Sequence, residues 1–296
     1  MKQLSLQNLE KIKDKHYRYC IELIEKEENK ILSEEERQTV RKLCCENPFV
    51  CKGKTISLSS DFKKYINGDI DYNSYYTIFR SDNNSDWNGV KLFEALDVKV
   101  CPYCGINYLT TVEKNEGNII TTATFDHYFP KKSREKSNEY GFLALNLYNL
   151  IPCCRNCNST FKLGNHKPVL NPYFYDIEQM FEFELTPQSI INELVGVDGD
   201  FEIKTKFTDT VLCKNHNDVI AINERYKAFK NIAKTLIYKR QKYSKDYLKS
   251  LEGLDISLSN INLEEMLVKQ DIFSNDEPLS KFKTDIWKQI SNEIKR

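Results

Sequence analysis

Apolar residues recur with helical spacing over the first 47 residues of the chain. Leu6, Leu9 and Ile12 begin this pattern, and spacings of three and four residues place side chains on one face of an α-helix. Ser33 is followed by three glutamates, which is typical of a helix start because acidic side chains stabilise the positive end of the helix dipole. We therefore expect residues 5–47 to be helical, with one helix beginning after Ser33.

Two later segments alternate between apolar and polar residues. They are residues 181–185 and 201–207, and Gly196 and Gly199 lie between them. A period of two is typical of a half-buried strand, and glycines favour a turn between strands. The pattern therefore predicts a β-hairpin.

Further helices are expected after the hairpin. Apolar residues such as Ile220 and Tyr226 recur with helical spacing over residues 217–250 and predict one long helix. Two more helices are expected over about 261–272 and 278–295. The chain is thus expected to belong to the α+β class, mostly helical with a small β-containing centre.

Length and charge narrow the class of protein. The chain has 296 residues, of which 40% are hydrophobic, so it is long enough for one large domain or two smaller ones and is not disordered as a whole. Its 43 basic residues balance its 43 acidic residues, which excludes a uniformly basic surface but not a local basic patch.

Several function classes are excluded by missing motifs. None of the ten glycines forms GxGxxG or GxxxxGK[ST], so neither a dinucleotide site nor a Walker-type ATPase site is expected. The first thirty residues are charged throughout, unlike a signal peptide. No apolar run approaches the roughly 18 residues that suggest a membrane span. We therefore expect a cytoplasmic protein that does not enter a membrane.

Four of the ten cysteines form two CxxC pairs. Cys101 and Cys104 make the first pair, and Cys154 and Cys157 make the second after the 49 residues 105–153. Two such pairs can place four sulfurs around one tetrahedral ion, so they predict a structural zinc site that brackets a folded element. The alternative is two separate pairs that are redox-active or inert. Cys153 breaks the x₂ spacing and is expected to be a buried apolar residue.

The segment between the cysteine pairs carries the chemistry. Asp126-His127 lies at the end of an expected strand, Asn149-Leu150 follows, and Cys157 is succeeded by Asn158 and, four residues later, Lys162. Together these motifs resemble the HNH endonucleases with their zinc-braced ββα-metal fold, over about residues 98–170. The resemblance implies three parts: a helical N-terminal region (1–97), an HNH nuclease module (98–170) and a C-terminal region of hairpin plus helices (171–296).

The resemblance also implies a role for each motif residue. His127 would be the general base, and Asn149 would brace the loop that holds it. Asn158 takes the third motif position, where the family often has histidine. The similar HNH domain of the RNA-guided CRISPR nucleases also pairs an aspartate before the histidine with such an asparagine on one Mg²⁺. Here that aspartate is Asp126.

The same roles follow from the chemistry of phosphodiester hydrolysis. The reaction needs a base for water and a cation on the scissile phosphate. His127 is suited to be the base, since an unperturbed histidine pKa is about 6.5. Asp126 and Asn158 offer the oxygen ligands that Mg²⁺ prefers, although another divalent cation would also fit. Adjacent strand residues point to opposite faces, so Asp126 and His127 can share a site only at a strand end or bulge.

Basic residues are candidates for binding nucleic acid. Lys131 and Lys132 follow the Asp-His pair, Lys162 shares a helix face with Asn158, and Lys230 and Lys234 lie in a basic, tyrosine-containing stretch. A solvated helix face is the alternative for that stretch. His166 is expected to be a solvated loop histidine rather than a phosphate contact.

These features predict a metal-dependent HNH endonuclease. DNA is the favoured substrate, with products bearing a 5′-phosphate and a 3′-hydroxyl. The Cys-Pro-Tyr-Cys, Asp-His-Tyr-Phe-Pro and Asn-Pro-Tyr pieces are similar to the PtuB-like component of bacterial Septu and retron anti-phage systems, which implies a separate ATPase partner. Two alternatives to a DNA-cleaving HNH endonuclease remain. One is a zinc-knuckle module that binds nucleic acid or a partner without catalysis, and the other is an HNH nuclease that cleaves RNA such as tRNA.

Overall fold

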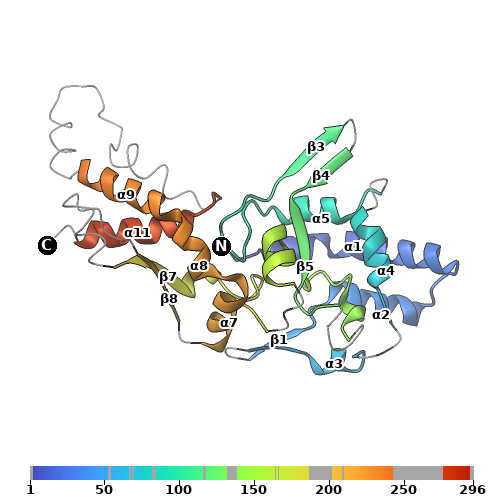
Figure 1. The fold of residues 1–296 in the computed structure, drawn as a ribbon. Helices are drawn as coiled ribbons and strands as arrows, with labels where there is room; N and C mark the ends of the chain where they lie inside the picture. Colours follow the sequence, from blue (N-terminus) through green and yellow to red (C-terminus); the bar gives the residue numbers. More distant parts are fainter. Residues whose placement is uncertain are drawn as a thin grey trace. The chain divides into compact units, whose positions relative to one another are not determined.

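Figure 1 shows a computed structural model of the chain, coloured along the sequence. The described residues combine helices with four small antiparallel sheets of two strands each, which is an α+β arrangement as expected. The structure describes residues 3–52, 55–66, 68, 70–81, 85–115, 118–131, 139–163, 165, 167–186, 202–208, 210–242 and 276–293.

The chain divides into two compact units. The first comprises Met1–Ile177 and Thr210–Ile220, and the second comprises Glu178–Asp209 and Ala221–Arg296. The boundary expected at residue 97 therefore falls inside the first unit, where the N-terminal helices and the cysteine-rich segment fold together.

Two helices open the first unit and confirm the N-terminal prediction. They are α1 (Leu6–Glu28) and α2 (Glu34–Cys45), and they pack against each other. Ser33 caps α2 by accepting from the Glu36 backbone N–H, while the Glu36 side chain accepts from the Ser33 backbone. This reciprocal capping box satisfies two backbone donors that a helix start leaves unpaired.

Shorter elements complete the N-terminal part of this unit. They are β1 (Phe49–Lys52), β2 (Thr55–Leu58), α3 (Ser60–Lys63), α4 (Asn73–Ser81) and α5 (Gly89–Leu96). His16 of α1 is fully buried here, and its ring meets Phe79 of α4 edge-on. The Nε2 atom of His16 lies 2.8 Å from the carbonyl oxygen of Leu145, which ties α1 to the central segment.

The central segment contains the strands that carry the candidate site. β3 (Thr111–Asn115) pairs with β4 (Asn118–Thr121), and β5 (Ala123–His127) pairs antiparallel with β6 (Leu150–Cys154). The chain then enters η2, a wide π-helical turn over Asn156–Phe161. The turn η1 (Gly141–Leu143) precedes β6, and α7 (Val211–Ile220) returns from the C-terminal half to pack near η2.

The second unit confirms the hairpin. β7 (Phe181–Leu185) pairs antiparallel with β8 (Ile203–Phe207), and burial alternates strictly along β7. The expected turn glycines, Gly196 and Gly199, lie outside the described residues. The apolar face of β7 packs against α11 (Ser280–Glu293), where Phe282 is fully buried. The short turn η3 spans Ile177–Gln179.

The prediction of one continuous helix over residues 217–250 is wrong. Instead α7 ends at Ile220, and α8 (Ile222–Tyr226), η4 (Lys227–Phe229) and α9 (Lys230–Lys242) follow. Ala221 has a φ of 56°, a left-handed conformation that cannot continue a right-handed helix. Residues 243–250 and the helix expected over 261–272 lie outside the described residues, and none of the described helices is long and apolar enough to cross a membrane.

Candidate functional site

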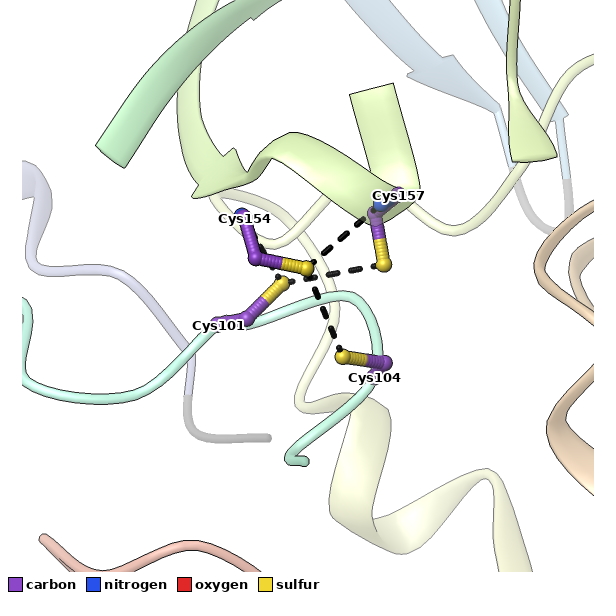
Figure 2. Close-up of side chains that lie close together, drawn as sticks. All are labelled: Cys101, Cys104, Cys154 and Cys157. Atoms are coloured by element: carbon purple, nitrogen blue, oxygen red, sulfur yellow. Dashed lines mark hydrogen bonds between the residues drawn. The ribbon is translucent and has the colours of Figure 1, made fainter. Parts of the chain in front are cut away.

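The two CxxC pairs meet in space, as their spacing predicted. The four sulfur atoms of Cys101, Cys104, Cys154 and Cys157 lie within 4.8 Å of one another, and all four residues are buried (Figure 2). Sγ of Cys101 is 3.8 Å from Sγ of Cys157, and Sγ of Cys104 is 3.9 Å from Sγ of Cys154. Four sulfurs about 2.3 Å from a tetrahedral zinc would be separated by about 3.8 Å. This cysteine quartet can therefore hold a metal ion such as zinc.

Amide groups around the quartet favour negatively charged sulfur. The backbone N–H of Cys154 points at Sγ of Cys101 at 3.4 Å, and the Asn107 side-chain amide points at Sγ of Cys154 at 3.3 Å. Because metals bind the thiolate rather than the thiol, these donors support a ligand role.

Cys153 lies outside the quartet. Its side chain is fully buried, and its sulfur is 3.9 Å from the Thr124 hydroxyl. Burial raises the pKa of the Cys153 thiol well above its ordinary value. Cys153 is thus a buried, protonated residue, as the spacing argument expected.

A cavity of about 230 Å³ lies at the end of β5, next to the quartet. Its lining brings together five residues singled out in the sequence. The lining residues are Asp126, His127, Pro130, Lys131, Asn158, Lys162, Leu163 and Asn165. Cys157 directly precedes Asn158 in the chain, so one residue of the quartet and one lining residue of the cavity are sequence neighbours.

His127 is the last residue of β5 and is almost completely buried. Its Nε2 lies 3.0 Å from the carbonyl oxygen of Ala144. Because a carbonyl only accepts, Nε2 carries the proton and Nδ1 keeps its lone pair. Burial, helped by the charge of Lys131, lowers the pKa of His127 to about 4. The ring of Tyr76 packs edge-on against the imidazole, with 4.5 Å between the ring centres. At neutral pH, His127 is therefore an uncharged base in a fixed orientation.

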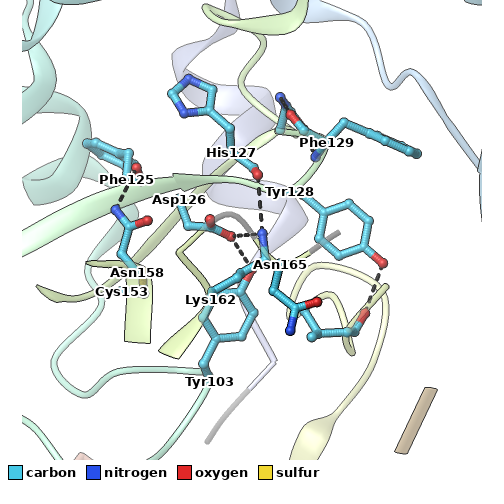
Figure 3. Close-up of polar contacts among 12 residues, drawn as sticks. Tyr103, Phe125, Asp126, His127, Tyr128, Phe129, Cys153, Asn158, Lys162 and Asn165 are labelled. Atoms are coloured by element: carbon cyan, nitrogen blue, oxygen red, sulfur yellow. Dashed lines mark hydrogen bonds and ion pairs between the residues drawn. The ribbon is translucent and has the colours of Figure 1, made fainter. Parts of the chain in front are cut away.

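The Asp126 carboxylate is held by two donors. Both the Tyr103 hydroxyl, at 2.8 Å, and the Lys162 ammonium, at 2.6 Å, donate to its Oδ2 atom (Figure 3). Its side chain leaves β5 on the side opposite the His127 imidazole, as the strand pleat requires (Figure 3). The two side chains therefore lie on opposite faces of β5, and both line the cavity because the strand ends at His127.

Lys162 is placed differently from the surface contact with nucleic acid that the sequence suggested. Its side chain is only 6% exposed, and its ammonium donates to Asp126 Oδ2 and, at 3.2 Å, to the carbonyl oxygen of His127. A charge this buried must be paired to be tolerated. Lys162 therefore lies in the cavity and binds the last two residues of β5.

Asn158 presents its amide toward β5. Its Nδ2 donates to the Thr124 hydroxyl and to the Phe125 carbonyl oxygen, both at 3.2 Å. Since both bonds use the nitrogen, neither engages the carbonyl oxygen, which is the atom suited to a hard cation.

Asn149 lies outside the cavity and spans the turn after β5. It is fully buried. Its Oδ1 accepts from the Phe129 backbone N–H at 2.8 Å, and its Nδ2 donates to the carbonyl oxygens of Phe129 and Leu143. These contacts are of the kind needed to brace the loop that follows His127.

The basic residues proposed to bind nucleic acid lie in different parts of the structure. Lys131 lines the cavity, with its ammonium 4.2 Å from the centre of the Tyr76 ring. Lys132 and His166 lie outside the described residues. Lys230 and Lys234 are partly exposed on α9, which belongs to the second unit.

Sequence reasoning missed Tyr103, Tyr76 and the Ala144 carbonyl. Tyr103 had a detectable signal, because it lies between the two cysteines of a proposed metal knuckle. Tyr76 is an ordinary apolar position of a helical pattern, and a backbone carbonyl has no sequence signature at all.

Comparison with known proteins identifies no relative. No protein-family model, curated protein or solved structure matches the chain significantly.

Proposed function

We propose that the chain is a metal-dependent HNH endonuclease that hydrolyses phosphodiester bonds, with DNA as substrate. One observation carries the proposal: a single cavity is lined by a neutral histidine base and two hard oxygen donors, beside a metal-competent cysteine quartet. The order β5, β6, η2 supports a ββα-metal module, with zinc as the ion in the quartet.

The chemistry follows from the placement of these groups. A phosphodiester lying across the end of β5 would face Asp126 and Asn158 on one side and His127 on the other. Nδ1 of His127 takes a proton from water, whose oxygen attacks phosphorus and displaces the 3′-oxygen, which leaves as an alkoxide and takes a proton from solvent. A divalent cation held by Asp126 and Asn158 would neutralise charge on the phosphate and the leaving oxygen. The products are a 5′-phosphate and a 3′-hydroxyl.

A direct activity assay tests this proposal. Purified protein is incubated with Mg²⁺ or Mn²⁺ and with plasmid DNA, single-stranded DNA or total tRNA. The resemblance to anti-phage systems extends the proposal to a separate ATPase, so each reaction is repeated with an ATPase encoded beside the gene. DNA cleavage is expected, whereas cleavage of tRNA alone would favour the RNA-directed alternative. Binding without cleavage in every reaction would favour a non-catalytic zinc-knuckle module.

Removing a proposed cation ligand should raise the metal requirement. In Asp126→Asn or Asn158→Ala, one oxygen ligand of the cation is weakened or lost. We expect the Mg²⁺ concentration for half-maximal cleavage to rise at least about 10-fold, the equivalent of about 1.4 kcal/mol, with partial rescue at high Mg²⁺. Asn215→Ala is the control, because that amide donates to the Pro168 carbonyl oxygen away from the cavity. An unchanged Mg²⁺ dependence in both ligand variants contradicts the assignment.

Reversing charge on α9 tests the proposed contact with the nucleic-acid backbone. In Lys230→Glu/Lys234→Glu we expect affinity for DNA to fall roughly 10-fold or more. The slope of log K against log salt should flatten by about 2, because each lysine–phosphate contact contributes about one unit. Binding is measured by fluorescence anisotropy at several salt concentrations. Lys204→Glu/Lys206→Glu on β8 carries the same change in net charge. Equal losses in both variants would show a general charge effect and remove α9 from the binding surface.

A further inference from the structure

Tyr103 connects the cysteine quartet to the cavity. It lies between Cys101 and Cys104, and its side chain is fully buried. Its hydroxyl donates to Oδ2 of Asp126 at 2.8 Å (Figure 3). Its backbone carbonyl accepts from Nε2 of His216 on α7 at 2.9 Å. The backbone of Tyr103 is thus held by α7, and the chain on either side of it is held by Cys101 and Cys104 of the quartet.

We propose that Tyr103 is a positioning residue that sets the orientation of the Asp126 carboxylate and thereby the cation affinity of the cavity. This inference rests on the proposed function, because it assigns Asp126 to a cation. Both donors to the carboxylate engage Oδ2, which leaves Oδ1 for the cation.

The geometry explains why a second donor is needed. Lys162 also donates to Oδ2, at 2.6 Å. With this ammonium alone, the carboxylate could rotate until both oxygens faced the positive charge, which would withdraw Oδ1 from a cation. Both side chains are buried, but lysine has a flexible stem of four carbons, whereas the Tyr103 ring is rigid and its backbone lies between two residues of the quartet. Tyr103 is therefore the donor that fixes the rotation.

The quartet would consequently hold both oxygen ligands. Cys157 directly precedes Asn158, and Cys101 and Cys104 flank the tyrosine that orients Asp126. A metal ion in the quartet would position the cation site from two sides, in addition to stabilising the fold.

Tyr103→Phe isolates this effect because it removes only the hydroxyl. The probe is Mn²⁺, titrated into the full-length, zinc-loaded protein while electron paramagnetic resonance measures the free ion. We expect the Mn²⁺ dissociation constant of Tyr103→Phe to rise about 10-fold, in line with the loss of one hydrogen bond to a charged acceptor. Zinc content should match the unmodified protein, and thermal unfolding should change no more than in the control variant, which also loses one buried hydroxyl. Tyr173→Phe is the control, because it is also fully buried and its hydroxyl donates only to the Leu150 carbonyl oxygen, at 3.1 Å.

The results separate this inference from the proposed function. Equal Mn²⁺ affinity in Tyr103→Phe and Tyr173→Phe overturns the role of Tyr103, and so does loss of zinc from Tyr103→Phe, which would make the hydroxyl a part of the knuckle fold. An Asp126→Asn variant shows whether Mn²⁺ binds in the cavity at all. If this variant binds Mn²⁺ like the unmodified protein, the cation site itself is wrong, and the role of Tyr103 falls with it.

Discussion

Replacing His127 by alanine is expected to reduce phosphodiester cleavage by about 10²–10⁴-fold, the usual contribution of one general base. Zinc content and substrate binding should change little, because the base acts on water. His127→Gln is the matched variant, since its amide can still donate to the Ala144 carbonyl oxygen that now accepts from Nε2 but cannot take up a proton. Both variants are compared with the unmodified protein in single-turnover cleavage of DNA, with added Mg²⁺.

His127→Ala and His127→Gln should cleave DNA at the same reduced rate but differ in their stability. If alanine abolishes cleavage and glutamine restores it, His127 acts through structure rather than as a base. If both cleave at the unmodified rate, the nuclease site is elsewhere, and the zinc-knuckle binding module becomes the better account.

The pH dependence of cleavage gives an independent check on His127. Burial lowers its pKa to about 4, so the free base predominates at every pH above this value. The rate should therefore stay level as the pH falls through 6.5, the ordinary histidine pKa, and decline only as it approaches 4. A decline centred near 6.5 would mean that the imidazole is solvated when it reacts.

Removing two ligands of the quartet should unfold the first unit. In Cys104→Ser/Cys157→Ser each cysteine pair loses one ligand, so neither pair can complete a tetrahedral site. Structural zinc supplies about 10–16 kcal/mol of apparent binding free energy in small zinc domains, which is comparable to the roughly 5–15 kcal/mol that stabilises a whole domain. We expect metal analysis to fall from about one zinc per chain to none, and thermal unfolding to lose its cooperative transition.

Cys51→Ser is the control for this variant. Cys51 is exposed on β1, so its replacement should change neither zinc content nor the unfolding temperature. Cooperative folding of the double variant without zinc would show that the quartet does not hold the fold together.

Local sequence patterns were sufficient for the regular elements. The spacing of Leu9 and Ile12 and the Ser33 cap determined α1 and α2, and alternation determined β7. The quartet was predictable for a related reason, since each CxxC pair already places two sulfurs on one turn. Each helix, the strand and each single CxxC pair depends on residues within a few positions of one another.

The long helix expected over residues 217–250 is interrupted at Ala221, where tertiary structure overrides the local preference for helix. Ala221 favours helix by intrinsic propensity, yet it adopts a left-handed conformation with a φ of 56°. Residues 210–220, directly before it, belong to the first unit, and the residues from Ala221 onward belong to the second. A change of unit depends on which distant residues cover each segment, and helical periodicity carries no information about that.

The sequence by itself determined which residues could do the chemistry: the quartet, Asp126-His127 and Asn158. Only the tertiary structure decided their partners. It paired Lys162 with Asp126, aimed the Tyr103 hydroxyl at the same carboxylate, and brought His216 onto the backbone of Tyr103. These partners are 23 to 113 residues apart in the chain. The physical reason is that a buried charge or hydroxyl takes whatever partner the packed chain brings within about 3 Å.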